Sequence, residues 1–152
     1  MLERAKERIS KEAPSGIRIF EGDFRAIPFE EASYDVIIAA AVLHHLRDDR
    51  DWEEAFQKIY RLLRPGGSSW ITDLVAQESE AIHQLMWHRY GNYLETLGGA
   101  AYRDELLAYI AKEDSPRSVT YQIELMRRVR FDSVEILHKN SCFAAFGGVK
   151  GG

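Results

Sequence analysis

Two adjacent histidines, His44 and His45, are the first residues in this sequence whose type could do chemistry. An imidazole can take up or release a proton near neutral pH, or bind a metal ion. Adjacent side chains on a helical turn point in different directions, and no acidic or cysteine partner stands at ligand spacing, so we predict no metal site. If the protein uses a catalytic base, His45 and His88 are the candidates, and the catalytic residues remain unknown.

The elements around the histidines predict a parallel sheet. Residues 36–40 are a short apolar run between polar residues, typical of a strand buried on both faces. Residues 51–63 place apolar side chains at helical spacing, and a second apolar strand is predicted at residues 69–74. Strand, helix and strand of this length form a right-handed crossover between parallel strands.

The turns of this crossover place the candidate site. Pro65 forbids further helix, and Gly66-Gly67 permits a backbone exit with positive φ. Ligands of such sheets bind beyond the carboxyl ends of the strands, where Ala40 and Ala41 would lie. Their small side chains let a ligand approach the backbone.

Three motifs in this order resemble a known family. The strings YDVIIAAAVLHHL (residues 34–46) and LLRPGG (62–67), preceded by EGDF (21–24) and IPF (27–29), resemble class I S-adenosylmethionine (SAM) dependent methyltransferases. The resemblance covers nearly the whole chain, and it implies a Rossmann-like α/β fold with the strand order 3-2-1-4-5-7-6.

The resemblance also implies roles for individual residues. Asp23 would accept a hydrogen bond from the adenine amino group of SAM, and Phe24 would offer its backbone N–H and ring face to adenine. Ala40, Ala41 and His45 would line the rest of the cofactor site. The alternative for the first pair is an Asp that caps a turn and a Phe that belongs to the core.

The sequence lacks the segment with which domains of this family open. That segment is a strand, a turn of the Gly-x-Gly-x-Gly kind that approaches the methionyl group, a helix, and a second strand whose final acid binds the ribose. Here the first glycine is Gly16, and residues 1–5 resemble the start of the helix that follows the second strand. We therefore expect a domain truncated at its N-terminus that binds SAM weakly or not at all and is inactive alone.

Residues 77–112 are predicted to be mostly helical and rich in aromatic side chains, with a break at Gly98-Gly99. One interpretation is a packed helical pair, and another is an inserted lid over the substrate, as the family places such insertions. The candidate substrate contacts in this block are His88, Arg89, Tyr90 and Arg103, each of which could instead be an exposed helix side chain. The expected methyl acceptor is a small molecule or a modified nucleoside.

The last part of the chain predicts a helix and a hairpin. A helix is expected to begin at Pro116 with Ser115 as its N-cap. Strands are expected at residues 133–138 and 142–149, the second antiparallel, joined at Lys139-Asn140. The stretch from residue 134 to residue 150 is similar to the end of carboxy-SAM synthase, an enzyme of tRNA modification, and this stays an alternative.

We therefore predict a partial Rossmann-like sheet in a single domain over residues 1–152. A further strand is expected at residues 17–20 and a helix over residues 1–11. Without family strands 1 and 2, the strand at residues 36–40 has an uncovered apolar edge that invites pairing. The strand at residues 17–20 could fill the gap, a missing segment could belong there, or a second copy could pair, and we expect a homodimer. Such a chain could also be a degenerate, non-catalytic module for self-association.

Composition limits the class of protein. The chain has 152 residues, 45% of them hydrophobic and 29% charged, typical of a globular protein. Its net charge of −4 argues against a broad phosphate-binding surface. No apolar run is long enough to span a membrane and the charged N-terminus is not a secretory signal. The single cysteine, Cys142, is expected in the core, and a cytoplasmic location is expected.

Overall fold

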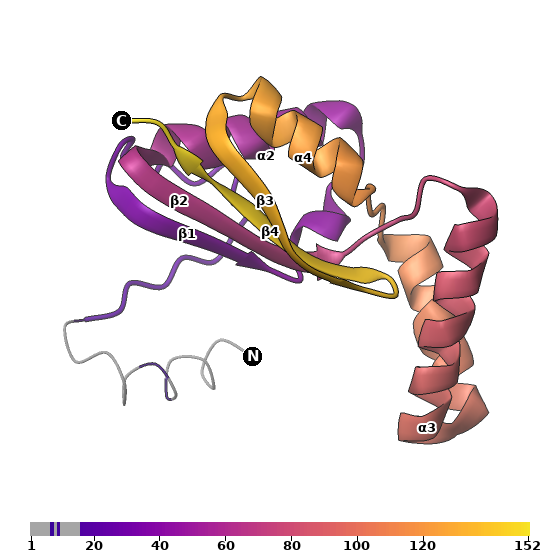
Figure 1. Cartoon of the computed structure of the whole chain (residues 1–152). Coiled ribbons are helices and arrows are strands. Elements are labelled where there is room, and N and C mark those ends of the chain that lie inside the picture. The colour runs from indigo at the N-terminus through magenta and orange to yellow at the C-terminus, as the bar shows by residue number, and fades with distance from the viewer. Residues whose placement is uncertain (1–6, 8, 10–15) are drawn as a thin grey trace.

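A four-stranded mixed sheet is the centre of the computed structural model, which describes residues 7, 9 and 16–152 (Figure 1). Its strands are β1 (Tyr34–Ala40), β2 (Leu63–Leu74), β3 (Phe131–Asn140) and β4 (Phe143–Lys150), arranged in the order β1-β2-β4-β3. β1 and β2 are parallel, and β4 runs antiparallel to both β2 and β3. This arrangement equals the 4-5-7-6 part of the predicted strand order and confirms the α/β fold.

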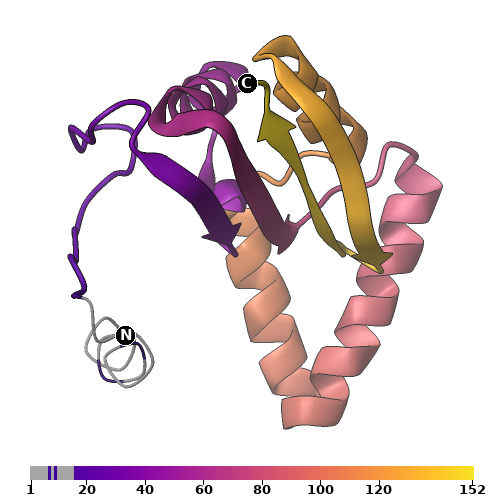
Figure 2. The ribbon, with the colours of Figure 1, turned by 60° about the vertical axis from the view of Figure 1, so that its left-hand side comes forward.

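Two helices, α2 (Asp49–Leu62) and α4 (Val119–Arg128), cover one face of this sheet (Figures 1 and 2). Helix α2 lies within about two residues of the predicted helix at residues 51–63. The Asp48 side chain caps it by accepting a hydrogen bond from Asp51 N at 2.9 Å. A short 3₁₀ turn, η1 (Leu43–His45), connects the end of β1 to α2.

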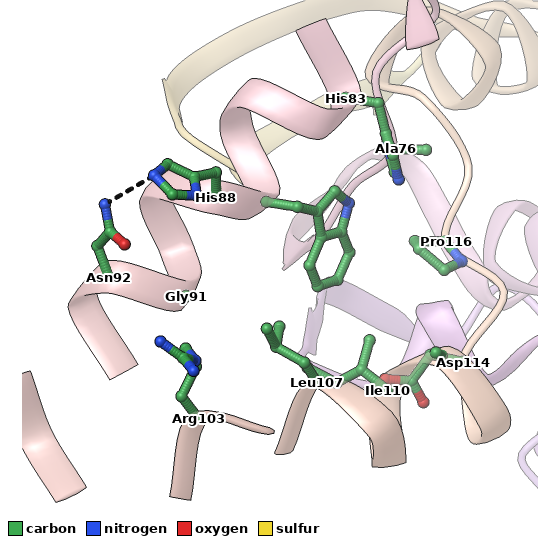
Figure 3. Close-up of a pocket in the computed structure, with 12 residues that line it drawn as sticks. Ala76, His83, His88, Gly91, Asn92, Arg103, Leu107, Ile110, Asp114 and Pro116 are labelled. Atoms are coloured by element: carbon green, nitrogen blue, oxygen red, sulfur yellow. Dashed lines mark hydrogen bonds between the residues drawn. The ribbon is translucent and has the colours of Figure 1, made fainter. Parts of the chain in front are cut away.

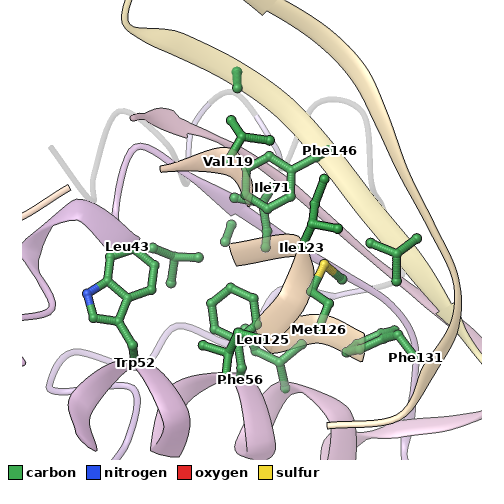
Figure 4. Packing of buried hydrophobic residues seen from close by; sticks show 14 of the residues in the cluster. Leu43, Trp52, Phe56, Ile71, Val119, Ile123, Leu125, Met126, Phe131 and Phe146 are labelled. Atoms are coloured by element: carbon green, nitrogen blue, oxygen red, sulfur yellow. The ribbon is translucent and has the colours of Figure 1, made fainter. Parts of the chain in front are cut away.

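The core lies between the sheet and these helices (Figure 4). Trp52 and Phe56 of α2 are buried against Met126 of α4 and against Ile71 and Phe146 of the sheet. Burying one such side chain stabilises the fold by roughly 1.5–3 kcal/mol. The same packing fixes the direction in which β1 and β2 end.

The predicted helical block is present as α3 (Glu80–Glu113), two helical halves that meet at Gly99, whose φ is 80° and ψ 177°. Figures 1 and 2 both show α3 as a hairpin beyond the carboxyl ends of β1 and β2. Its base is closed by a hydrogen bond from Ala76 N to Arg117 O, 3.2 Å long. Among the described residues, no helix has the length and apolar character that crossing a bilayer requires.

The prediction of a strand at residues 17–20 is wrong. Residues 16–20 have no regular secondary structure, and Ile19 and Phe20 are exposed. A strand must pair its backbone N–H and C=O groups with a neighbour, and here no described strand lies beside this segment. It does not pair with β1 either, so β1 is an edge strand with Val36 52% and Ile38 71% exposed.

Three smaller predictions concern the ends of elements. Helix α4 begins at Val119, not at Pro116, because Ser118 is the cap and accepts a hydrogen bond from Tyr121 N at 3.1 Å. The hairpin turns at Ser141-Cys142 instead of Lys139-Asn140, because those two residues still pair with β4. Glu7 and Ile9 are helical, and the rest of the helix expected over residues 1–11 lies outside the described residues.

Candidate cofactor and acceptor pockets

The first pocket, which we call the β1 pocket, lies at the carboxyl end of β1 and has a volume of about 520 Å³. It brings together Asp23, Phe24 and His45, three residues predicted for the cofactor site. Its apolar walls come from β1, η1 and α2, among them Ile37, Ile38, Ala39, Val42, Leu43, Ala55 and Ile59. A pocket of this size with few polar groups fits a small-molecule ligand.

Asp23 is held at the rim of the β1 pocket by Arg25. Arg25 donates from its backbone N to Asp23 Oδ1 at 2.8 Å and from Nη2 to Oδ2 at 2.9 Å. These hydrogen bonds lower the pKa of the Asp23 carboxyl below its ordinary value. Arg25 also contacts Asp51 of α2, so the Asp23 carboxylate is oriented and ionised at neutral pH.

Ala40 and Ala41 are not brought into the β1 pocket. The pocket is lined by Ile37, Ile38 and Ala39 of β1, and neither Ala40 nor Ala41 is among its lining residues. Ala41 has a positive φ of 52° and donates from its N–H to Thr72 O at 2.9 Å. This residue therefore turns the chain from β1 into η1 instead of approaching a ligand in this pocket.

His44 is buried and held by Asp73 at the end of β2. Asp73 Oδ2 accepts hydrogen bonds from Leu43 N at 2.7 Å and His44 N at 3.3 Å, and Oδ1 contacts His44 Nδ1. Burial lowers the pKa of His44, but the hydrogen bond to Asp73 and the negative charges of Asp73 and Asp114 outweigh burial and raise it above the ordinary value. The ring orientation of His44 is therefore fixed by one carboxylate.

The reasoning that the two histidines point apart and lack an acidic partner is wrong. Their ring centroids lie 4.2 Å apart on η1. Asp114, which follows α3, lies with Oδ1 2.9 Å from His45 Nδ1 and with Oδ2 3.7 Å from His44 Nε2. Ser115 N donates to His44 O at 2.7 Å and fixes the Asp114 segment against η1.

A second pocket, which we call the α3 pocket, has a volume of about 570 Å³ and lies between the two halves of α3 and the segment after it (Figure 3). It contains His88 and Arg103 from the predicted substrate set. Arg103 pairs with Glu95 and, at 2.8 Å, with Asp104. The remaining lining is largely apolar or aromatic and includes Ala76, Trp87, Leu107, Ile110, Ala111 and Pro116.

Arg89 and Tyr90 are not part of the α3 pocket. They line a separate hollow of about 320 Å³ together with Ser141 and Phe143. Neighbouring helix residues are about 100° apart around the axis, which separates residues 88 and 89 onto different sides of α3. The Tyr90 ring packs edge-to-face on Phe143, with centroids 5.1 Å apart, and burial raises the pKa of its hydroxyl. The predicted substrate residues are therefore divided between two pockets.

Comparisons with known proteins agree with this arrangement. A family model described as a methyltransferase domain matches residues 1–71. The chain is 29% identical over 139 residues to demethylmenaquinone methyltransferase of Lactococcus lactis subsp. lactis, covering 89% of this chain and 53% of that protein. The YcgJ protein of Bacillus subtilis has a TM-score of 0.66 at 14% identity, over 100% of this chain and 79% of that one. Human N-acetylserotonin methyltransferase in complex with SAM has a TM-score of 0.56 at 22% identity, over 88% and 33% of the two chains.

The sequence matches and the strand order point to one family. The chain is similar in sequence to methyltransferases and has the fold of the class I SAM-dependent methyltransferases. The chain spans about half the length of the curated relatives it matches, 53% and 56% for two of them. The solved structures, each of low sequence identity, support the methyltransferase fold alone.

The sequence analysis missed two carboxylates near the two pockets, Asp73 and Asp114. Asp73 is the polar residue near the carboxyl end of β2, where ligands of parallel sheets bind, so the rule that selected Ala40 could also have found it. No signal in the sequence pointed to Asp114, because it approaches η1 only through the return of α3 to the sheet. Long-range packing of this kind leaves no local pattern.

Proposed function

We propose that this chain carries the acceptor-binding part and most of the adenine-binding part of an enzyme that transfers a methyl group from SAM to a small molecule or a modified nucleoside. One observation carries the proposal: the two pockets meet. His45 lines the β1 pocket, Asp114 lines the α3 pocket, and their side chains lie 2.9 Å apart.

In this proposal SAM occupies the β1 pocket and the acceptor occupies the α3 pocket. Asp23 and Phe24 take the adenine, and the sulfonium methyl points toward the contact between His45 and Asp114. Methyl transfer requires an in-line approach of donor and acceptor more than it requires an acid or base. Two pockets joined at one polar contact supply such an approach, and α3 acts as a lid with His88 and Arg103 facing the acceptor.

The isolated 152-residue chain is expected to bind SAM weakly. Its sequence contains no Gly-x-Gly-x-Gly turn for the methionyl group, nor the strand-end acid for the ribose. Hydrogen bonds to charged groups contribute roughly 1.5–3 kcal/mol each. Because about 1.4 kcal/mol changes affinity tenfold, the loss of two or three weakens a micromolar ligand by several powers of ten.

The test is an NMR titration of the chain with SAM and with S-adenosylhomocysteine at millimolar concentration. We expect weak, saturable shifts confined to the amides around Asp23, Phe24, Ile38 and His45. Asp23→Asn should weaken them, and Asp35→Asn, an exposed carboxylate outside the pocket, should not. Shifts elsewhere, or none, contradict the assignment of the β1 pocket, and a micromolar dissociation constant contradicts the argument about the missing turn.

A second function is favoured by the exposed edge of β1, where Val36 and Ile38 are open to solvent. In this alternative the chain is a non-catalytic methyltransferase-like domain that associates with a second copy of itself. Ile38 lines the β1 pocket as well as the exposed edge of the sheet, so a homodimer through β1 would compete with SAM for this surface. An unchanged NMR spectrum at millimolar SAM, together with a stable dimer, would favour self-association alone.

A further inference from the structure

Three side chains converge where the two pockets meet. His44, His45 and Asp114 each offer one nitrogen or oxygen atom, and these atoms all lie within 4.8 Å of one another. Two of the separations are 2.9 Å and 3.7 Å. Two imidazole nitrogens and one carboxylate oxygen are the donor set of open zinc sites, in which three protein ligands leave a position for water or substrate.

A fourth residue, Asp73, gives His44 the orientation of a metal ligand. Asp73 is fully buried and contacts His44 Nδ1, so the lone pair of Nε2 faces Asp114. Metal-binding histidines commonly donate their second ring N–H to a carboxylate, which fixes the tautomer and makes the imidazole a stronger ligand. The contact between Asp73 and His44 therefore has the form expected around a bound metal.

The third ligand, Asp114, is a buried carboxylate whose hydrogen bonding is incomplete. Its side chain is 4% exposed, and Oδ1 accepts no well-aligned hydrogen bond although His45 Nδ1 lies 2.9 Å away. A buried carboxylate without full compensation is costly. An ordinary ion pair would direct an N–H at this oxygen, whereas a shared cation would lie between the two atoms.

We propose that His44, His45 and Asp114 bind one divalent transition-metal ion of the zinc type, with Asp73 positioning His44. Two nitrogen ligands disfavour Mg²⁺ and Ca²⁺, which prefer oxygen. This inference does not depend on methyl transfer. In a methyltransferase, such an ion would lower the pKa of an acceptor thiol, hydroxyl or water placed in the α3 pocket.

The experiment uses the full 152-residue chain, without a histidine tag and stripped by a chelator. Zn²⁺ binding is measured by calorimetry, and Co²⁺ provides a visible absorption spectrum that reports coordination geometry. We expect one saturable site per chain and a tetrahedral Co²⁺ spectrum. His45→Ala, at a position 52% exposed, and Asp114→Asn should each weaken binding about tenfold or more.

The matched control is His138→Ala, which removes an exposed histidine of β3 and should bind Zn²⁺ as the unaltered chain does. Asp73→Asn should weaken binding about 10–100-fold. Circular dichroism reports whether that buried variant folds, and if it does not, the two ligand variants decide alone. Absence of saturable binding, or equal binding by His45→Ala and Asp114→Asn, would overturn the proposal and leave an ion pair.

Discussion

Lys58 of α2 holds the loop that carries Asp23 and Phe24. Its ammonium group donates to three backbone carbonyls, Phe24 O at 2.6 Å, Arg25 O at 2.9 Å and Ile27 O at 2.5 Å. It also lies 5.1 Å from the centre of the Phe24 ring. One side chain thus replaces the strand pairing that this segment of the chain lacks.

Lys58→Met should therefore destabilise the protein by about 2 kcal/mol, because it leaves three carbonyls without their charged donor. The free energy of unfolding in urea measures the loss. Lys112→Met is the control, since the Lys112 side chain is 81% exposed and makes only a surface ion pair. Equal stability of the two variants would mean that water replaces the ammonium group without cost.

Cys142 is fully buried at the turn between β3 and β4, as predicted for a core residue. Burial raises the pKa of its thiol to about 11 from 9.0. Two units of pKa reduce the thiolate fraction about a hundredfold at pH 8, and burial blocks access as well. The native thiol should react with a disulfide reagent at least about 100-fold more slowly than the unfolded chain.

The same shift determines a dependence of stability on pH. The unfolded thiol ionises near pH 9 and the folded one near 11, so the unfolded state gains stability as pH rises through this window. The free energy of unfolding should therefore fall between pH 9 and 11 by more than in Cys142→Ala.

For the labelling experiment, Ser79→Cys places a reference thiol at an exposed position. Labelling of native Cys142 as fast as this reference thiol would contradict the assignment of Cys142 to the core.

At the scale of elements, two glycines of α3 have opposite requirements. Gly99 has φ 80° and ψ 177°, a conformation that is essentially restricted to glycine, although a methyl group there would meet no atom within 4 Å. Gly91 is helical, and a methyl group there would touch Arg103 and Leu107 at 3.5 Å, an ordinary contact. Position 99 therefore requires glycine for its backbone conformation, and position 91 does not.

Gly99→Ala should lower the free energy of unfolding by about 1–3 kcal/mol through backbone strain. Gly91→Ala should raise it by about 0.5–1 kcal/mol, because alanine favours helix. Denaturation followed by far-UV circular dichroism measures both changes. A loss of stability in both variants would show that packing, and not backbone conformation, dominates at these positions.

The elements predicted from the sequence were those determined by local pattern. The apolar run of β1, the spacing of Trp52 and Phe56, and the exit at Gly66, whose φ is 76°, depend on neighbouring residues only. Arg130, which follows α4, has a φ of 77°, a conformation that favours glycine. The prediction of a strand at residues 17–20 failed because a strand forms only beside another strand, and the local sequence pattern does not show whether such a neighbour is present.

The residues of the candidate site also divide into those that a local sequence pattern predicts and those that long-range packing places. His45 and Asp23 follow strands or turns that have a local signature, and both line the β1 pocket. Asp114 and the separation of Arg89 from His88 depend on how α3 returns to the sheet. The similarity of the tail to carboxy-SAM synthase stays a prediction.

At the scale of the whole molecule, the sheet has a face that none of the described helices covers, opposite α2 and α4 (Figure 2). Val36 and Ile38 lie on this face at the edge strand β1, and Trp70 of β2 is next to them. Parallel strands are normally buried on both faces. β3, the other edge, carries Asp132, Glu135 and Lys139, charges that oppose pairing between sheets.

We therefore expect β1, and not β3, to mediate self-association. Light scattering of the chain should give about 35 kDa, twice the 17.5 kDa chain mass. Ile38→Lys should return it to the monomer mass, because a charge on the pairing strand opposes association. Ile136→Lys on β3 is the matched control at an exposed isoleucine and should remain dimeric. A monomer at high concentration of the unaltered chain would contradict the prediction.

The closed base of α3 has a consequence for how such a domain can change. Ala76 and Ser118 pair with each other where the chain leaves the sheet and where it returns, and no residue of α3 belongs to the main core between the sheet, α2 and α4. α3 contacts the ends of the sheet strands through a second, smaller cluster that contains Leu74, Ile110 and Cys142. The tip of the hairpin around Gly99 belongs to neither cluster, so the tip can vary in length and composition at little cost to the folding of the sheet. A scaffold of this kind can reshape the α3 pocket by exchanging one segment, while the β1 pocket is inherited unchanged.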